Sequence, residues 1–283
     1  MITKSLLQTT FVCGALSCTL LQGCSDKKIM PKGEISSIQA DTTVFLKPGN
    51  KQSPSCHVAI DFSYIRPGSE QDSLSMQINH QLQRIAFGTN FMKREPEEAI
   101  KAVKSYYSST YVKELESLYD ADLKNGAKFD QLPSWYNFEY DISSEIKTSR
   151  DSILNYSVTH YENTGGAHPN TYITWANINS HTGKVLTRSD VFTKGSDKKT
   201  IELITKYLLK EVNRRLETDT IKTLQGLQDN GMLLNVDLYV PENFLITEEG
   251  VTFLYNRYDI APYVMGDFQL SIPYAEIEKL MKM

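Results

Sequence analysis

The segment HVAIDFSYI (residues 57–65) decides the fold class that this sequence predicts. Apolar residues recur at every second position, which is typical of a β-strand with one face buried in a core. These residues are Val58, Ile60, Phe62 and Tyr64. A similar segment, residues 38–46, precedes it, and the turn sequence KPGN (residues 47–50) lies between the two. The sequence therefore predicts two strands connected through a turn.

Helical spacing replaces this alternation on the C-terminal side. Apolar residues three and four places apart predict a helix around residues 74–85 and a longer one from Pro96 to about Gly126. Alternating segments then return, and one further helix is expected at about residues 197–216. The later strands are expected at residues 136–148, 153–161, 172–178, 244–247, 251–255 and 267–272, with a short helix after Pro273. Hairpins with interspersed helices predict an α+β fold, with antiparallel sheets and helices packed on one face.

The first residues of the chain have the composition of an exported lipoprotein. A basic start at Lys4 leads into a broken apolar run, residues 6–21, which is too short to span a membrane stably. The run ends in LQGC (residues 21–24), the pattern in which the cysteine takes a diacylglyceryl group and signal peptidase cuts before it. We therefore expect a signal peptide over residues 1–23 and lipid on Cys24. This anchor predicts a place in the cell envelope, on the outer membrane, with the body in the periplasm or on the cell surface.

About 260 residues remain after such a cut, enough for one large or two small domains. The expected division is a polar tether (24–35), an N-terminal α+β domain (36–150) and a C-terminal α+β domain (151–283). Cys56 is the one cysteine left to the folded part, so no internal disulfide is expected. Its place beside an alternating apolar segment predicts a buried, unreactive thiol.

Composition and motifs exclude several classes of function. The exported part is mildly acidic and has no basic block, which argues against nucleic acid as a partner. The sequence has no phosphate-binding loop, no Gly-x-Ser-x-Gly elbow and no His-Glu-x-x-His helix. Residues 120–126 imitate the start of a calcium loop, but Gln131 stands where the bidentate glutamate belongs. His160 and His168 flank one loop, yet two histidines without a nearby carboxylate or thiolate make a weak metal site. Neither metal nor cofactor is expected.

The loop TGGAHPN (residues 164–170) combines backbone freedom with polar side chains. Gly165 and Gly166 permit backbone angles closed to other residues, or the close approach of another segment. His168 and Asn170 then place polar groups on either side of a proline. Two interpretations remain open. The loop is either a tight structural connection in which His168 bonds to backbone, or a recognition loop.

At this loop the sequence resembles a known family. The matching motifs are GGAH (165–168), NSHTGK (179–184), DVF (190–192), a hairpin over 244–255 that turns at Glu249-Gly250, YDIAPY (258–263), Gly266 and Ile272-Pro273. Together they resemble the extracytoplasmic region of RsiV-like anti-sigma factors, whose outer domain binds lysozyme. The front half, from Val58 through the 74–85 helix, resembles the domain usually found before it. The same domain pair precedes the catalytic domain of PdaC-type peptidoglycan deacetylases.

The chain departs from both kinds of relative. It has no Asp-Asp pair and no His-x-x-x-His motif, so the deacetylase catalytic domain is missing. A lipid anchor also replaces the cytoplasmic segment and membrane span of the anti-sigma factors. The resemblance therefore leaves open whether any role in sigma-factor signalling is retained.

Two classes of function follow. The first is a binding module for a lysozyme-like protein or a cell-wall glycan, and the second is a hydrolase of envelope polymers with His168 as base and Asp259 as its partner. Binding is favoured because no nucleophile, metal set or carboxylate pair is apparent in the sequence. Abundant tyrosine, with sixteen residues, also suits a recognition surface. The expected binding residues are Gly165, Gly166, His168, Asn170, Tyr258, Asp259, Pro262 and Tyr263.

Overall fold

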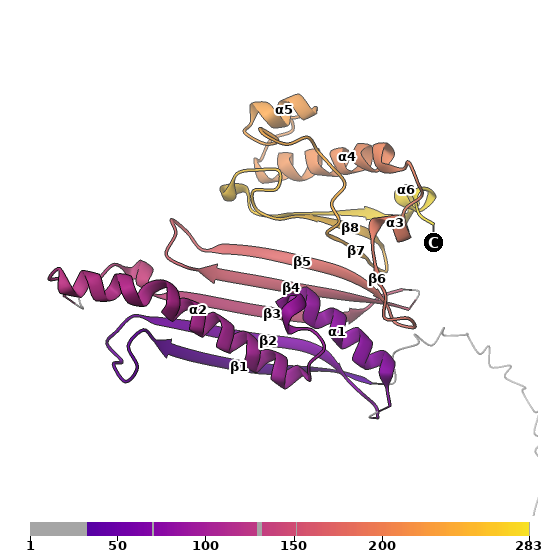
Figure 1. Ribbon diagram of the computed structural model, residues 1–283. Coiled ribbons are helices and arrows are strands. Elements are labelled where there is room, and N and C mark those ends of the chain that lie inside the picture. Colours follow the sequence, from indigo (N-terminus) through magenta and orange to yellow (C-terminus); the bar gives the residue numbers. More distant parts are fainter. Residues whose placement is uncertain (1–32, 70, 129–131, 151, 283) are drawn as a thin grey trace, which may run out of the picture.

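Two β-sheets and the helices that cover them make up the structure (Figure 1). This computed structural model describes residues 33–69, 71–128, 132–150 and 152–282. Six strands form one mixed sheet in the order β1-β2-β3-β4-β5-β6, and three form an antiparallel sheet in the order β7-β8-β9. The predicted α+β class, with two consecutive α+β parts, is confirmed.

The first sheet and its helices come first along the chain. In order, these elements are β1 (Glu34–Phe45), β2 (Ser55–Arg66), α1 (Ser73–Phe87), η1 (Thr89–Phe91), α2 (Pro96–Lys124), η3 (Ser134–Tyr136), β3 (Phe138–Thr148), β4 (Ile153–Asn163), β5 (Asn170–Asn179) and β6 (Val185–Leu186). The Asp72 side chain caps α1 by accepting from Ser75 N, and Pro96 begins α2, where a missing N–H costs nothing.

One pair of strands departs from the expected antiparallel arrangement: β2 and β3 are parallel. The chain leaves β2, crosses one face of the sheet as α1 and α2, and re-enters beside β2 in the same direction (Figure 1). A parallel neighbour requires such a crossover, since a short turn can only reverse the chain. The other four strand pairs of this sheet are antiparallel.

Even-numbered positions of the central strands face α1 and α2 and form the first core. The strand residues include Val58, Ile60, Phe62, Ile142, Leu154, Tyr156 and Val158, and the helix residues include Ile78, Leu82, Val103, Tyr111 and Leu115. Burying each large apolar side chain contributes roughly 1.5–3 kcal/mol, so this layer holds the helices on the sheet. Cys56 lies in the same core, and burial raises the pKa of its thiol to about 12, as expected for an unreactive cysteine.

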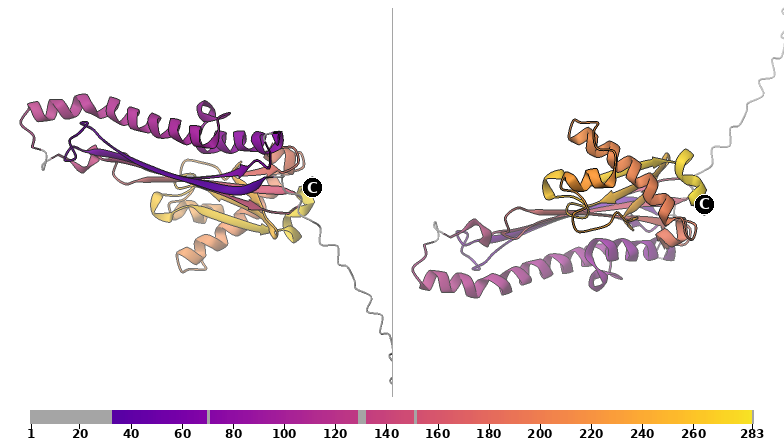
Figure 2. Two further views of the ribbon diagram at one scale, coloured as in Figure 1. Left: turned by 90° about the horizontal axis from the view of Figure 1, so that it is seen from below. Right: turned by 90° about the horizontal axis from the view of Figure 1, so that it is seen from above.

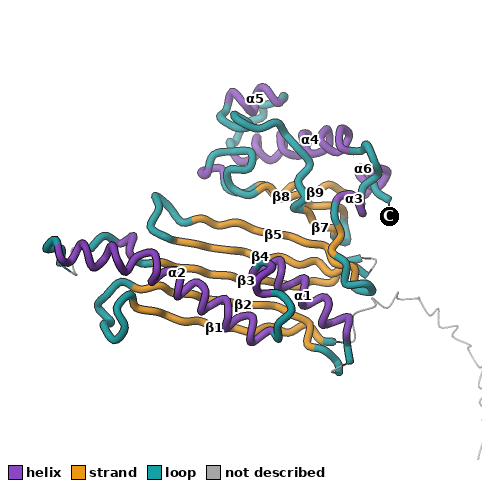
Figure 3. Tube along the Cα trace, viewed as in Figure 1, coloured by secondary structure: helices purple, strands orange, loops and turns teal. Residues whose placement is uncertain are grey.

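A smaller unit follows, built from the second sheet and one long helix (Figure 3). Its elements are α3 (Arg188–Val191), α4 (Asp197–Arg215), α5 (Leu224–Asp229), β7 (Phe244–Ile246), β8 (Gly250–Tyr255), η4 (Tyr263–Met265), β9 (Phe268–Pro273), α6 (Tyr274–Ile277) and η5 (Glu278–Leu280). The side of α4 that carries Ile204, Leu208 and Val212 is buried against the sheet and forms the second core with Phe253, Leu270 and Ile272. Figure 2 shows this unit on the side of the first sheet opposite to α1 and α2.

Asparagine side chains join the two units along β5. Asn243 accepts from Trp175 N and donates to Ile173 O, both at 2.7 Å, and Asn256 accepts from Ile173 N at 2.7 Å. The buried Asn177 amide donates to Phe244 O and accepts from Ile246 N. Because β6 pairs only with the C-terminal end of β5, the Asn243 and Asn256 amides occupy backbone groups of β5 that a neighbouring strand would otherwise satisfy.

The limits of the first sheet differ from the domain limits expected from the sequence. β1 begins at Glu34, inside the segment assigned above to the tether, while Cys24 lies outside the described residues. The first sheet continues through β4 and β5, across the expected domain limit at residue 150. Within the described ranges, no helix combines the length and the apolar character needed to cross a membrane.

Candidate recognition site

Two loops that are far apart in the sequence meet at one end of the molecule. The loop between β4 and β5 carries His168, and the loop between β8 and β9 carries Tyr258 and Tyr263. His168 Nε2 lies 2.9 Å from the Tyr258 hydroxyl. The imidazole also stacks on the Tyr263 ring, with 3.9 Å between ring centroids and 20° between ring planes. We call these three residues the aromatic cluster.

Each loop is held in shape by contacts within the protein. Gly165 has φ +83°, and a Cβ at this position would lie 2.3 Å from Trp135 Cβ, so only glycine fits. Gly166 has no such contact, and the structure gives it no evident role. The Tyr263 hydroxyl donates to Pro169 O at 3.2 Å, which ties the two loops together.

The second loop is fixed at both ends. Asn256 N donates to the Asp259 carboxylate at 2.7 Å, and Tyr258 adopts φ +70°, in the left-handed region. At the other end, Arg215 of α4 donates to the carbonyls of Met265 and Asp267. The loop therefore presents its side chains on a defined backbone rather than on a free segment.

The surface around the cluster is open and partly apolar. The exposed fraction is 59% for Tyr258, 88% for Val264 and 65% for Leu234. A hollow of about 320 Å³ lies beside Tyr258, between residues 231–236 and 258–262. The Arg257 guanidinium lies over the Tyr263 ring, 5.0 Å from its centroid. Arg257, Leu234 and Val264 were not singled out from the sequence, since exposed loop residues carry no periodic signal.

The remaining expected binding residues lie around this cluster. Asn170 is exposed at the first position of β5, and Pro262 is exposed just before η4. Asp259 is half-buried with its carboxylate turned to the Asn256 backbone, and desolvation raises its pKa. Asp259 therefore shapes the loop that carries Tyr258.

The expected partnership of His168 and Asp259 is not formed. His168 Nδ1 lies 3.1 Å from Pro169 O, and its Nε2 faces Tyr258. No hydrogen bond joins His168 to Asp259 in the part of the chain that the structure describes. The His168 ring is thus held by the Pro169 carbonyl and the Tyr258 hydroxyl rather than by the Asp259 carboxylate that the hydrolase alternative requires.

His160 and His168 lie in separate surroundings. His160 is buried on the helix-covered face, where it stacks on Tyr172 with 4.6 Å between centroids. Burial lowers its pKa to about 4, partly offset by a hydrogen bond with the Ala86 backbone. Across the described residues, no group of three or more His, Cys, Asp or Glu side chains is arranged to hold a metal ion.

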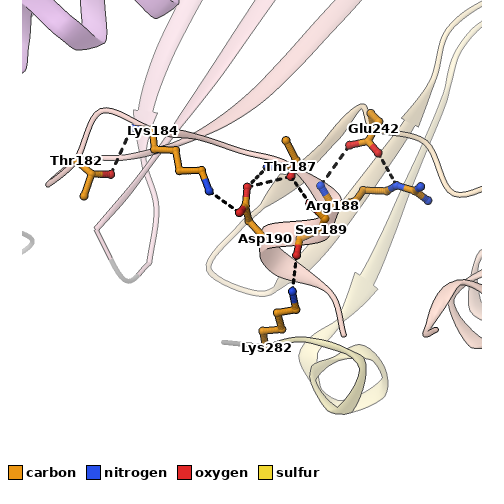
Figure 4. Close-up of polar contacts among 8 residues, drawn as sticks. All are labelled: Thr182, Lys184, Thr187, Arg188, Ser189, Asp190, Glu242 and Lys282. Carbon is orange, nitrogen blue, oxygen red and sulfur yellow. Dashed lines mark hydrogen bonds and ion pairs between the residues drawn. The ribbon is translucent and has the colours of Figure 1, made fainter. Parts of the chain in front are cut away.

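The motif residues between 179 and 192 form a polar corner between the two units (Figure 4). Lys184 Nζ lies 2.5 Å from the Asp190 carboxylate, which also accepts from Thr187 in a capping box on α3. The Lys184 contact, with help from Thr187, lowers the pKa of Asp190 to about 2. Arg188 pairs with Glu242 at 2.8 Å, and Lys282 donates to Ser189 O. These residues fix the path of the chain from β6 into α3.

Two family models match successive parts of the chain. Residues 52–171 match the model described as deacetylase PdaC, and residues 189–275 match the model described as a protein of unknown function, DUF3298. The chain carries the PdaC-like and DUF3298 domain pair of RsiV-like proteins. The aromatic cluster thus joins the end of the PdaC-like match, at His168, to the DUF3298 domain, at Tyr258 and Tyr263.

Solved structures agree with this assignment. A DUF3298 family member from Bacteroides fragilis is 28% identical, with a TM-score of 0.78 over 89% of this chain and 96% of that chain. A DUF3298 family protein from Pseudomonas aeruginosa shares the fold at 17% identity, with a TM-score of 0.56 over the same shares of the two chains. No curated protein matches the chain.

Proposed function

We propose that this chain is a binding module of the cell envelope, and that the aromatic cluster is its recognition site for a lysozyme-like protein or a cell-wall glycan. The observation that carries this proposal is Tyr258, a largely exposed tyrosine on a loop whose backbone is fixed from both sides. Tyrosine loses little conformational entropy on binding and offers both a flat apolar face and a hydroxyl.

The surroundings of Tyr258 support the same proposal. Val264 and Leu234 add exposed apolar area at this end of the molecule, and Arg257 adds a cation beside Tyr263. Aromatic residues and arginine are enriched among the side chains that dominate binding energy. Since exposed apolar residues cost solubility, their grouping on a fixed loop suits a surface that another molecule covers.

The proposal is tested by measuring binding of the unlipidated chain to lysozymes and to purified peptidoglycan. Tyr258→Ala is expected to weaken binding to one of the two by about 2 kcal/mol, roughly 30-fold, with little change in melting temperature. Tyr263→Ala is expected to weaken binding as well, but also to lower the melting temperature, because its ring is half-buried on His168. Lysozyme binding without peptidoglycan binding identifies a protein partner, and the reverse identifies a glycan.

A matched control is available in the PdaC-like domain. Tyr106 of α2 is exposed to a similar extent, 53%, and lies outside the cluster. Tyr106→Ala is expected to bind as the unchanged chain does. Equal affinities for Tyr258→Ala, Tyr263→Ala and Tyr106→Ala would remove the aromatic cluster as the recognition site.

A further inference from the structure

A second hollow lies in the PdaC-like domain, on the helix-covered side of the first sheet. It has a volume of about 280 Å³ and is enclosed by the end of β2, by α1 and by the first residues of α2. α1 and α2 lie side by side on that face (Figure 1). The lining residues that matter here are Tyr64, Arg66, His80, Arg94, Glu95 and Glu97. The aromatic cluster shares none of these residues.

Tyr64 lines this hollow and makes no hydrogen bond through its hydroxyl within the described residues. The side chain is only 8% exposed, and its ring stacks on Phe62. Its hydroxyl has no hydrogen-bond partner among residues 33–282 as described, and it is not one of the fully enclosed polar atoms. A tyrosine that is more than nine-tenths buried and makes no hydrogen bond within the described structure leaves its hydroxyl able to bond a ligand.

Two sources of positive charge, a helix N-terminus and two arginines, line the same hollow as Tyr64. The N-terminus of the 29-residue helix α2 lies at the hollow, and its N-cap residue Glu95 makes no side-chain capping bond. Uncapped amides and the helix dipole favour an anionic group there. The Gln83 side chain fixes the backbone of Arg94, because it accepts a hydrogen bond from Arg94 N and donates one to Arg94 O. Arg66 donates to Ser36 Oγ, and in the described ranges no ion pair links either arginine to a carboxylate.

The same rim carries two carboxylates. Glu95 and Glu97 are exposed and line the hollow without pairing with Arg66 or Arg94 in the described structure. Their charge opposes a multiply charged anion such as phosphate, and it favours a ligand that also carries a cation. We propose that the hollow binds a small zwitterion, a free amino acid or a short peptide. Its carboxylate meets Tyr64, Arg66 and Arg94, and its ammonium group meets Glu95 and Glu97.

Titration calorimetry on the full-length chain in detergent solution tests this site, with dialanine and alanine as probes. Dialanine is expected to bind, and blocking either end of the dipeptide, as in N-acetyldialanine or dialanine amide, is expected to weaken binding by about tenfold or more. Stronger binding of dialanine than of alanine indicates a peptide ligand, and the reverse indicates a free amino acid. Absence of binding by both at about 10 mM, or tighter binding of inorganic phosphate, overturns the proposal.

Two variants connect the binding to these residues. Tyr64→Phe removes only the hydroxyl, and Arg94→Gln removes one exposed charge, so both are expected to fold and to weaken dialanine binding by about tenfold. Lys101→Gln is the control, since it removes a charge from the exposed face of α2 outside the hollow. Wild-type affinity in both Tyr64→Phe and Arg94→Gln, with unchanged melting temperatures, excludes this site even if dialanine binds elsewhere.

Discussion

His160 is a buried histidine that the recognition site does not use. Its ring stacks on Tyr172 beneath α1, and burial lowers its pKa to about 4, against about 6.5 in an unfolded chain. Between these two pH values the unfolded chain binds a proton that the folded protein excludes. The contribution of neutral His160 to the free energy of unfolding is therefore fully present above pH 6.5. It is lost as the pH decreases toward 4, by roughly 3 kcal/mol.

Urea unfolding at pH 7.5, 5.5 and 4.5 measures that loss. The His160→Phe variant, which keeps a flat ring but cannot take up a proton, is expected to lose stability over this interval by about 2.5 kcal/mol less than the unchanged chain. His181→Gln, at an exposed position, provides the control. If His160→Phe and the unchanged chain lose stability in parallel, His160 is not the group responsible.

At the residue scale, the sequence could single out side chains of the two loops but could not show which of them touch. His168 and Tyr258 are 90 residues apart, and their contact depends on how the DUF3298 domain packs on β5. The two interpretations of the loop 164–170 both have a counterpart in the structure. Gly165 is required by its close approach to Trp135, while His168 contacts both backbone and the tyrosines. Whether a partner binds there stays a prediction.

At the scale of elements, β5 depends on amide side chains in place of a neighbouring strand. Asn243 satisfies Trp175 N and Ile173 O with one side chain. Asn243→Ala leaves Trp175 N unpaired, whereas Ile173 O keeps a bond from the Asn256 side chain, and the substitution is expected to lower the free energy of unfolding by about 2 kcal/mol. Asn230→Ala, which removes an exposed bond to Gly226 O within α5, is expected to cost less than about 1 kcal/mol. Equal urea midpoints for the two variants would show that the amides do not stabilise β5.

The periodicity of apolar residues predicted most helices and strands, but it could not predict the parallel pairing of β2 with β3. The alternation over residues 57–65 becomes β2, and the three- and four-residue spacings become α1, α2 and α4. The parallel pairing of β2 with β3 was missed because alternation shows which face of a strand is buried, not which strand lies beside it. The short elements β6, α3 and α5 were missed as well, since segments of two to six residues hold too few positions to show a period.

For the whole molecule, the expected lipid on Cys24 decides where the two domains work. Cys24→Ala is expected to release the protein from membranes or to leave it unprocessed, which membrane fractionation and N-terminal sequencing measure. Cys56→Ala is the matched control, because that thiol is buried in the PdaC-like core. A Cys24→Ala protein that stays with membranes at the normal level and is still cut before residue 24 would refute the anchor.

The parallel junction between β2 and β3 also sets the order in which the chain can fold. β3, β4 and β5 follow one another through short turns, so they can pair soon after they are formed. The pairing of β2 with β3 closes a loop that runs from Pro67 to Asn137. Closing so long a loop costs conformational entropy before the strand contacts form. The hairpin of β1 and β2 is therefore expected to dock late, and the edge of β3 is expected to be most open to pairing with another copy before that moment.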